Sequence, residues 1–385
     1  MKILFIGNQG NTGYRFVKWL RERGLEAFLA IPKNSNLERS FPEWQSPDLK
    51  NGYPAWIVPF KENRFPYFFP NRRLKKLSRQ YDILLTTGMY ILPVLKLKKP
   101  VGFLPVGGDI TQVPFASDSI IEEVFSFLYR RRIKNVARIF TEQKDCIWAA
   151  RLLGQGEKIE KVPFWVDVKE IKKNINKVLL DKLKEKYSQY DWLFYNPSRK
   201  NLNPDKSNYK GSEKLLSAYS RFIKDHPEKK ILMICGLHGD DVNAFKEKVN
   251  HLGLGDAVEF VEHMPLPDLH AYMSLENLVV FDQFTLDLSA LGGVAREALA
   301  LGRIVVTSTD VKASDFVEAY GEECPLLPAF NEEQINRRME EIIALSNPEV
   351  ASRNQDIMTW AENHLHWEKR IDEFIWMLNN MHNSN

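Results

Sequence analysis

The chain is poor in cysteine and has no long apolar run. Its 385 residues include three cysteines, which stand far apart between apolar neighbours. This arrangement favours neither a disulfide framework nor a zinc site, and it is typical of the reducing cytoplasm. No stretch approaches the roughly 18–20 consecutive apolar residues that a membrane-spanning helix needs. Residues 1–7, MKILFIG, run directly into a turn of Gly and Asn, which predicts a first strand rather than a signal peptide.

Several catalytic motifs are also absent. No two acidic residues stand two positions apart, so the Asp-x-Asp pair of metal-dependent sugar transferases is missing, and we expect neither a metal nor another cofactor. Gly-x-Ser-x-Gly, His-Glu-x-x-His and paired Cys-x-x-Cys motifs do not occur. All eight histidines lie between His226 and His382, so a base in the first half must be a carboxylate. Asp109, at the end of a predicted strand, is the best placed, and a helix cap or turn residue is the equal alternative for it.

The net charge of +3 conceals two halves of opposite sign. Residues 1–170 carry 28 Lys and Arg against 17 Asp and Glu, a charge of +11, whereas residues 171–385 carry 25 against 33, a charge of −8. Basic residues cluster at 72–76, 96–99 and 130–134. Such clusters are either solvated helix faces or surfaces attracted to anionic lipid head groups, at roughly 1 kcal/mol per charge. No nucleic-acid-binding module accompanies them, so nucleic acid is not an expected partner.

Strand and helix patterns alternate along the chain in two series. The first series starts with the strand at 2–7, and residues 34–70 are predicted to be irregular. The polar segment 169–177 has no core pattern and predicts a domain boundary, after which the alternation restarts with a strand at 192–197. Strands that alternate with helices at this spacing predict parallel, doubly wound sheets. We therefore predict an α/β fold of two Rossmann-like domains, with ligands bound in the cleft between them.

A glycine-rich turn follows the first predicted strand. Gly7, Gly10 and Gly13 form a G-x-x-G-x-x-G pattern, with Gln9 where a dinucleotide fingerprint has its second glycine. The next strand ends at Pro32 without an acidic residue for a ribose, which disfavours NAD. The turn still offers backbone N–H groups to a bound anion.

Three features that suit an anion fall at the predicted carboxyl edge of the second sheet. Arg199 follows its first strand, Lys210 precedes its first helix, and Gly292 and Gly293 open a short helix that carries Glu297. An arginine fork, a lysine charge and the unpaired N–H groups of a helix start all suit a diphosphate. Glu297 is near enough to reach a sugar hydroxyl of the same ligand. The alternative is a set of ordinary surface charges beside an ordinary strand–loop–helix.

The order and spacing of these motifs resemble the GT-B glycosyltransferases, specifically the large retaining family four. The motifs that match are the glycine turn, Gly107-Gly108-Asp109, Pro197-Ser198-Arg199, Lys210-Gly211, Ile234-Cys235-Gly236, 258–272 and Gly292 to Gly302. The resemblance implies a GT-B fold with an acceptor-side domain at 1–173 and a nucleotide-sugar-binding domain at 174–360. It also implies a C-terminal helix, 361–385 with Trp367, that crosses back to the first domain.

The resemblance further implies roles for individual residues. Arg199 and Lys210 would hold the donor diphosphate, and Glu297 would accept hydrogen bonds from the ribose hydroxyls. Gly10 and Asn11 would approach the phosphates from the first domain. The other implied donor-binding residues are Leu266 and Pro267, which would border the base, and Gly236, Asp287, Ser289, Gly292 and Gly293.

One position departs from the family pattern. The family's E-x7-E motif ends at Glu297, but Ser289 stands where the first glutamate would touch the transferred sugar. Asp287 is either a substitute for that glutamate or an exposed loop acid. Some polysaccharide transferases of this type also lack the first glutamate and carry an Asp-Gln near this point, as Asp282 and Gln283 do here.

We therefore expect transfer of a sugar from a nucleoside diphosphate donor to a glycan, polysaccharide or lipid-linked acceptor hydroxyl, with retention and without metal. Asp109, Arg199 and Lys210 are the expected catalytic residues, and the acceptor is expected near Asp109 and the aromatic segment 53–70. The expected location is the cytoplasm, at the inner face of an anionic membrane. The alternatives are an inverting transferase with Asp109 as base, a non-catalytic nucleotide-sugar or glycan-binding relative, and a phosphorylase or epimerase of the same fold.

Overall fold

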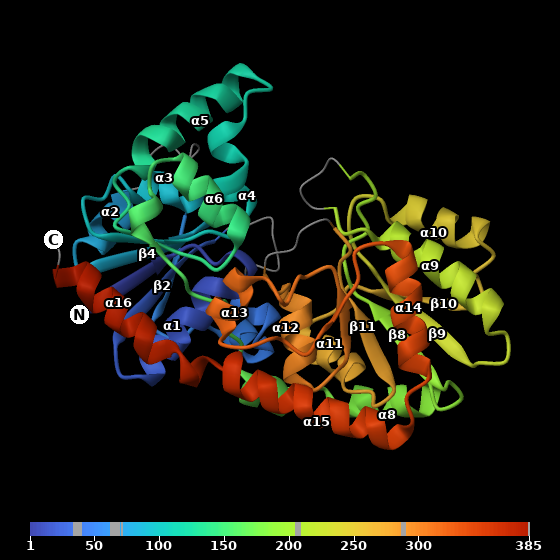
Figure 1. Cartoon of the computed structure of the whole chain (residues 1–385). Helices are drawn as coiled ribbons and strands as arrows, with labels where there is room; N and C mark the ends of the chain where they lie inside the picture. The colour runs from blue at the N-terminus through green and yellow to red at the C-terminus, as the bar shows by residue number, and fades with distance from the viewer. Residues whose placement is uncertain (34–40, 62–69, 71, 205–208, 286–289, 384–385) are drawn as a thin grey trace. The chain divides into compact units, whose positions relative to one another are not determined.

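The chain folds into two compact units. The computed structural model describes residues 1–33, 41–61, 70, 72–204, 209–285 and 290–383 (Figure 1). The first unit combines Met1–Phe164 with Trp367–Asn385, and the second spans Trp165–His366. The predicted boundary segment 169–177 lies inside the second unit, where it forms helix α7 (Val168–Lys173) and the start of α8 (Lys177–Lys186).

The first unit is built on a parallel sheet. Within the described residues it has seven strands in the order β3-β2-β1-β4-β5-β6-β7. The strands are β1 (Lys2–Ile6), β2 (Glu26–Pro32), β3 (Ile57–Phe60), β4 (Ile83–Thr87), β5 (Val101–Leu104), β6 (Arg138–Phe140) and β7 (Ile159–Glu160). Successive strands extend the sheet in one direction from β1 to β3 and in the other from β4 onward. The loops that follow β1 and β4 therefore flank the topological switch point, where ligands of such sheets bind.

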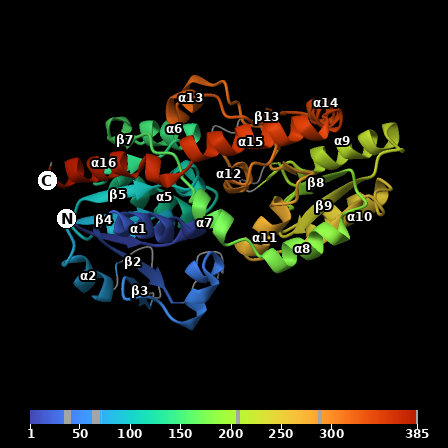
Figure 2. The same cartoon turned by 90° about the horizontal axis from the view of Figure 1, so that it is seen from below.

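Helices cover both faces of this sheet (Figures 1 and 2). Helices α1 (Thr12–Glu22) and α16 (Ile371–Asn383) lie on one face, where the ring of Phe16 meets that of Phe374 at 5.1 Å and Trp19 stacks on Trp367 at 5.8 Å. The other face carries the helices α2 (Arg72–Ser78), α3 (Ile91–Val94), α4 (Gly108–Thr111), α5 (Ile120–Ile133) and α6 (Lys144–Leu152). These five helices share one buried apolar cluster with the strands.

Residues 34–70 were predicted to be irregular, and this prediction is wrong for residues 57–60. They form strand β3, which pairs in parallel with β2 at the edge of the sheet. The strand is short and contains Pro59, which is tolerated because an edge strand has one side without a partner. Two turns of 3₁₀ helix, Pro42–Trp44 and Pro47–Asn51, precede it.

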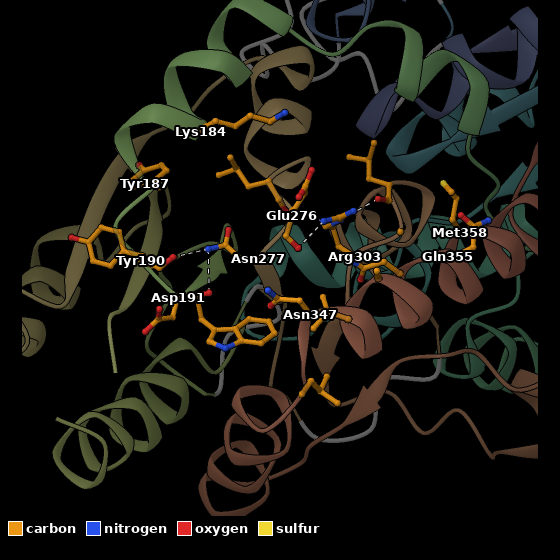
Figure 3. Close-up of a pocket in the computed structure, with 18 of the residues that line it drawn as sticks. Lys184, Tyr187, Tyr190, Asp191, Glu276, Asn277, Arg303, Asn347, Gln355 and Met358 are labelled. Atoms are coloured by element: carbon orange, nitrogen blue, oxygen red, sulfur yellow. Dashed lines mark hydrogen bonds between the residues drawn. The ribbon is translucent and has the colours of Figure 1, made fainter. Parts of the chain in front are cut away.

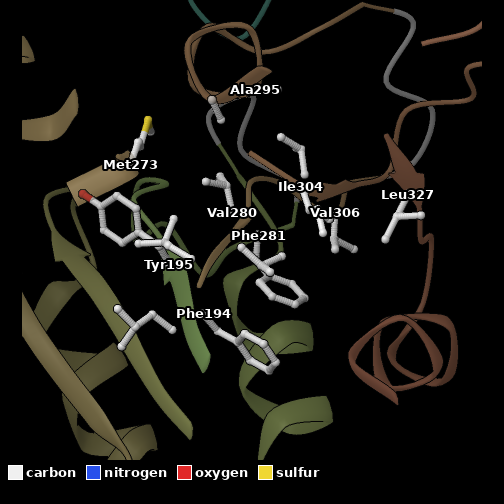
Figure 4. Close-up of a cluster of buried hydrophobic side chains, with 14 of the residues drawn as sticks. Phe194, Tyr195, Met273, Val280, Phe281, Ala295, Ile304, Val306 and Leu327 are labelled. Atoms are coloured by element: carbon white, nitrogen blue, oxygen red, sulfur yellow. The ribbon is translucent and has the colours of Figure 1, made fainter. Parts of the chain in front are cut away.

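The second unit repeats the architecture. Its parallel sheet has six strands among the described residues, in the order β10-β9-β8-β11-β12-β13. The strands are β8 (Trp192–Asn196), β9 (Ile231–Leu237), β10 (Val258–Glu262), β11 (Leu278–Phe281), β12 (Val305–Thr307) and β13 (Leu327–Pro328). The order reverses between β8 and β11, whose residues Phe194, Tyr195, Val280 and Phe281 lie at the centre of the core (Figure 4). Both strands are fully buried, as expected for a sheet covered on both faces.

The helices of the second unit pack against its sheet. Besides α7 and α8 they are α9 (Ser212–Asp225), α10 (Val242–His251), α11 (Leu266–Met273), α12 (Gly293–Ala300), α13 (Ser314–Tyr320), α14 (Glu332–Ile343) and α15 (Asn347–His364). Helix α15 ends in the second unit, and α16 begins at Ile371 in the first. Among the described residues, no helix combines the length and apolarity needed to cross a membrane.

Candidate functional site

The loops after β8 and β11 are tied together at the switch point of the second sheet. At the end of β8, the Asn196 amide donates to the carbonyl oxygen of Phe281 at 2.6 Å. The Ser198 hydroxyl lies 2.5 Å from the carbonyl oxygen of Asp282 and 2.9 Å from its Oδ1. Burial raises the pKa of the Asp282 carboxyl above its ordinary value, while the charge of Lys210 and the Ser198 hydroxyl oppose this rise. These bonds fix the two loops from which the predicted anion ligands project.

Lys200 is a central residue of this site that the sequence did not reveal. Its side chain is fully buried, and Nζ donates to Asn196 Oδ1 at 2.5 Å, to the Ser198 carbonyl at 2.8 Å and to the Asn196 carbonyl at 3.1 Å. Three donors thus meet three acceptors. Burial lowers the pKa of Lys200 to about 8. The neighbouring Arg199 is exposed. The hydrogen bonds of Lys200 therefore hold the loop from which Arg199 projects.

Lys210 approaches the same place from the loop before α9. Its Nζ donates to Gln283 Oε1 at 2.6 Å, and its carbonyl accepts from the amide of Phe284 at 2.9 Å. Burial lowers the pKa of Lys210, the carboxylate of Asp282 opposes this change, and the Arg199 guanidinium adds to it. Arg199 and Lys210 therefore act on each other electrostatically, as expected of two cations that face one anion.

Gly292 and Gly293 stand at the start of α12, beside the loop after β11. A Cβ on Gly292 would collide with Asp282 Oδ2 and approach Gln283 Nε2 to 2.9 Å, whereas a Cβ on Gly293 would meet no atom within 4 Å. The N-cap residue is Gly292 itself, which has no side chain to cap the helix start. Among the described residues, nothing occupies the space beside Gly293, and a helix start of this kind suits an anionic ligand.

Glu297 lies one turn further along α12 and is buried. Its Oε2 is 3.5 Å from Nε2 of His270, a buried residue of α11. His270 could not be predicted, because a histidine within an apolar helix carries no signal of its partner. This contact places a buried imidazole beside the carboxylate that the resemblance assigns to a ribose.

The other predicted donor-site residues of the second unit have structural contacts of their own. Gly236 lies in β9, where a Cβ would come within 3.3 Å of the Pro197 backbone, so the glycine lets the loop after β8 pack closely. Leu266 and Pro267 begin α11, and the Pro267 carbonyl accepts from the amide of Asn176 at 3.1 Å. Asp287 and Ser289 lie outside the described residues.

In the first unit, the turn after β1 holds two predicted residues. Gly10 and Asn11 both adopt left-handed backbone angles, with φ of 59°. Asn8 closes the turn, because its amide donates to Asn11 Oδ1 at 2.8 Å and its Oδ1 accepts from the Tyr14 amide at 2.7 Å. Asn11 is buried, whereas Gly10 is exposed and a Cβ there would meet no atom within 4 Å. Gly10 is thus the accessible member of the pair.

Asp109 is buried among backbone amides at the ends of two neighbouring strands. Its carboxylate accepts from Val106 N at 3.0 and 3.2 Å, and from Gly88 N at 3.1 Å. Gly88 follows β4 and Val106 follows β5, so the side chain joins the two loops in the manner of a turn residue. Burial raises the pKa of Asp109 to about 7, and the amide hydrogen bonds oppose that rise. The Asp109 carboxyl thus holds the two loops together. A pKa near neutral would also suit a general base.

A large pocket of the second unit lies at the opposite, amino edge of its sheet (Figure 3). It has a volume of about 900 Å³, and its wall includes Trp192 at the start of β8 and Asn277 just before β11. Arg303, just before β12, donates from this wall to the carbonyl oxygens of Leu275 at 2.8 Å and Leu301 at 3.1 Å. No predicted site residue that the structure describes lines this pocket. The described residues also contain no group of three or more His, Cys, Asp and Glu side chains that could hold a metal ion.

The comparisons agree with this architecture. Residues 206–356 match the family model described as glycosyl transferases group 1. The structure of HepE from Anabaena in complex with UDP-glucose is 14% identical, with a TM-score of 0.70 over 99% of this chain and 100% of that chain. A glycosyltransferase from Rickettsia africae is 14% identical, with a TM-score of 0.68 over 99% and 98% of the two chains. Sucrose-phosphate synthase from Thermosynechococcus elongatus is 12% identical, with a TM-score of 0.71 over 100% of both. No curated protein sequence matches the chain.

The fold is therefore that of the GT-B glycosyltransferases, as the sequence predicted. The resemblance to the group 1 enzymes is confirmed, and the family match covers most of the second unit, including α9 to α12.

Proposed function

We propose that the protein transfers a sugar from a nucleoside diphosphate donor to an acceptor hydroxyl, with retention of configuration and without metal. One observation carries the proposal: Arg199, Lys210 and the start of α12 come from two loops, β8–α9 and β11–α12, at the switch point of the second sheet. Two cations and a helix start form a site for a diphosphate. Because the solved HepE structures hold UDP and UDP-glucose, UDP-glucose is the first donor to test.

In this proposal the protein acts mainly on the leaving group. As the bond from the sugar to the diphosphate breaks, negative charge grows on the diphosphate oxygens next to Arg199 and Lys210. The acceptor proton passes to that leaving group on the same face of the sugar, so no separate protein base is needed. Glu297, which lies beside His270, accepts from the ribose hydroxyls and orients the donor. The cations favour the transition state over the ground state, which is what accelerates the reaction.

Arg199→Ala and Lys210→Ala test this assignment. Each variant loses one group that stabilises the developing charge, so we expect turnover to fall about 10²–10³-fold. UDP release and product formation are measured with UDP-glucose and candidate acceptors. Lys224→Ala, which removes an exposed lysine of α9, is the matched control and should retain full activity. If both site variants stay within a few-fold of the control, the assignment is wrong.

An inverting transferase is the second candidate, and the raised pKa of Asp109 favours it. Here Asp109 would take the acceptor proton directly, and Asp109→Asn would abolish transfer. The anomeric configuration of the product, read by NMR, separates the two mechanisms. Donor binding without hydrolysis or transfer would instead indicate a non-catalytic relative.

The acceptor is proposed to meet the first unit and to be a glycan or a lipid-linked sugar near an anionic membrane. The basic clusters at 72–76, 96–99 and 130–134 support this part of the proposal, because all three belong to the positively charged half of the chain.

A further inference from the structure

Helix α5 exposes an apolar face to solvent. Ile120 is 81% exposed, Ile121 70%, Phe127 55% and Val124 45%. Ile120, Val124 and Phe127 are spaced i, i+4 and i+7, so they lie along one side of the helix. Phe115 in the preceding 3₁₀ turn is also 40% exposed. Isolated exposed apolar residues are ordinary, but a contiguous stripe on one helix marks an interaction surface.

Helix α6 presents a second face of the same kind. Trp148 is 60% exposed and Leu152 56%, and they are one helical turn apart. Lys144 and Arg151 are exposed on the same side, whereas Cys146, Ile147, Ala149 and Ala150 are buried. An exposed tryptophan between cations is typical of side chains at a membrane–water interface.

The two helices belong to one layer. Tyr129 and Ile133 of α5 share a buried cluster with Cys146 and Ala150 of α6. Because both helices pack inward onto the same face of the sheet, their exposed sides are on the side away from it (Figure 1). We name this surface the α5–α6 face, and its exposed apolar residues are Phe115, Ile120, Ile121, Val124, Phe127, Trp148 and Leu152.

All three basic clusters lie in this same layer. Residues 72–76 form most of α2, which enters the shared cluster through Leu74, residues 96–99 follow α3, and residues 130–134 end α5. Arg130 and Arg132 are partly used internally, because they donate to the carbonyls of Pro114 and Leu92. The exposed cations are Arg72, Arg73, Lys75, Lys76, Lys96, Lys98, Arg131, Lys134, Lys144 and Arg151. The acidic residues of α5 and α6 are Glu122, Glu123 and Asp145, all in first turns.

We propose that the α5–α6 face inserts into the head-group region of an anionic lipid bilayer. The apolar side chains would enter the boundary with the acyl chains, and the surrounding cations would pair with lipid phosphates. The positive charge around the α5–α6 face argues against a second copy of the chain as its binding partner. A two-fold dimer would bring each face against its identical partner, and the cations would repel one another.

This inference adds a membrane-binding surface to the proposed function. It rests on that function only for the reason why the protein would bind a membrane, namely to reach a lipid-linked acceptor. Vesicle binding is measured without donor or acceptor. Loss of vesicle binding with intact transfer and loss of transfer with intact vesicle binding are therefore separate results.

Cosedimentation of the full chain with vesicles tests the proposal. We expect binding to vesicles of phosphatidylcholine with phosphatidylglycerol to be at least tenfold stronger than to phosphatidylcholine alone, and to weaken as salt rises. Ile121→Ser with Phe127→Ser should lower the partition coefficient about 100-fold, roughly tenfold for each apolar side chain removed from the lipid. Because both side chains are exposed, the double variant should melt at the wild-type temperature.

Trp376 provides the matched control. It is 62% exposed on α16, which covers the opposite face of the same sheet. Trp148→Ser should weaken vesicle binding about tenfold, whereas Trp376→Ser should leave it unchanged. Equal losses in both variants, or none in either, would overturn the proposal.

A fluorescent label reports insertion directly. The three native cysteines are buried, so Phe127→Cys can be labelled selectively with an environment-sensitive dye. Anionic vesicles should shift its emission to the blue, and a label at Val178→Cys in the second unit should not respond. If the protein binds vesicles but the emission of the label does not shift, the face does not insert into the bilayer and the proposal is wrong. The proposal is also wrong if the protein does not bind vesicles but self-associates, and Phe127→Ser abolishes that self-association.

Discussion

Asp109 couples the stability of the first unit to pH. Burial raises its pKa from 3.8 to about 7, so between these values the folded state binds a proton that the unfolded chain has released. The stability that this proton contributes is fully present below about pH 4 and is lost as the pH rises to about 7, at about 1.4 kcal/mol per pKa unit.

Asp109→Asn should remove that pH dependence. The free energy of unfolding of the wild type should fall between pH 4 and 7 by more than that of the variant, as measured by urea denaturation at several pH values. Asp82 is the control position, because the Lys2 amide lowers its pKa instead. Identical slopes for the wild type and Asp109→Asn would mean that the carboxyl titrates normally.

The burial of Lys200 and its place in the site could not be inferred from the sequence. In the sequence it stands next to Arg199, and nothing in the local pattern distinguishes it from an ordinary surface lysine. The fold exposes Arg199 and buries Lys200, since the three oxygen acceptors around Nζ exist only once the loop after β8 has closed. His270 beside Glu297 is a second case, because the pair joins α11 and α12 across 27 positions of sequence. By contrast, the positions of Arg199, Lys210 and Gly292 next to the ends of β8, α9 and α12 could be predicted, because the patterns of these elements are clear; their role at a donor site stays a prediction.

At the scale of elements, the two glycines that open α12 serve different purposes. Gly292 is fixed by its neighbours, because a Cβ would collide with Asp282. A Cβ on Gly293 would meet no described atom within 4 Å, so under the proposed function its absence matters to the ligand rather than to the packing. Substituting each of the two glycines should therefore have a different effect.

Gly292→Ala should lower the free energy of unfolding by about 1–3 kcal/mol, the usual cost of overpacking. Gly293→Ala should leave stability unchanged or raise it by up to about 1 kcal/mol, because alanine favours a helix. The same Gly293→Ala should weaken UDP binding by calorimetry, since its methyl group occupies the space proposed for phosphate. If Gly293→Ala binds UDP as the wild type does, the phosphate does not lie at the start of α12.

The alternation of strands and helices made most elements predictable, and the exceptions have physical reasons. Strand β3 has four residues and a proline, so its pattern is too short to distinguish from a loop. The C-terminal segment was predicted as one helix from 361, but α15 ends at His364. His366 there accepts a hydrogen bond from the Val168 amide at 3.3 Å, a contact 198 positions apart in the sequence. Local periodicity carries no information about such a contact.

At the scale of the whole molecule, donor binding should stabilise the protein. A ligand at about 100 times its Kd adds about 2.7 kcal/mol to the free energy of unfolding. We therefore expect UDP and UDP-glucose to raise the melting temperature, with uridine giving a smaller rise because it lacks the diphosphate. Arg199→Ala should remove most of the difference between UDP and uridine, and Lys224→Ala should preserve it. An equal response to UDP and uridine would show that the diphosphate is not recognised.

The first unit is assembled from both ends of the chain, and this sets the order of events during synthesis. Phe16 and Trp19 emerge from the ribosome before the second unit, but their partners Phe374 and Trp367 emerge only after it. At about 5–20 residues per second, the intervening second unit delays them by roughly 10 to 40 seconds. During that interval the amino-terminal segment carries an uncovered aromatic surface while the later unit can already fold. The first unit therefore begins before the second unit and is completed after it, and a nascent chain that stops before Trp367 lacks the helix that covers these aromatic side chains.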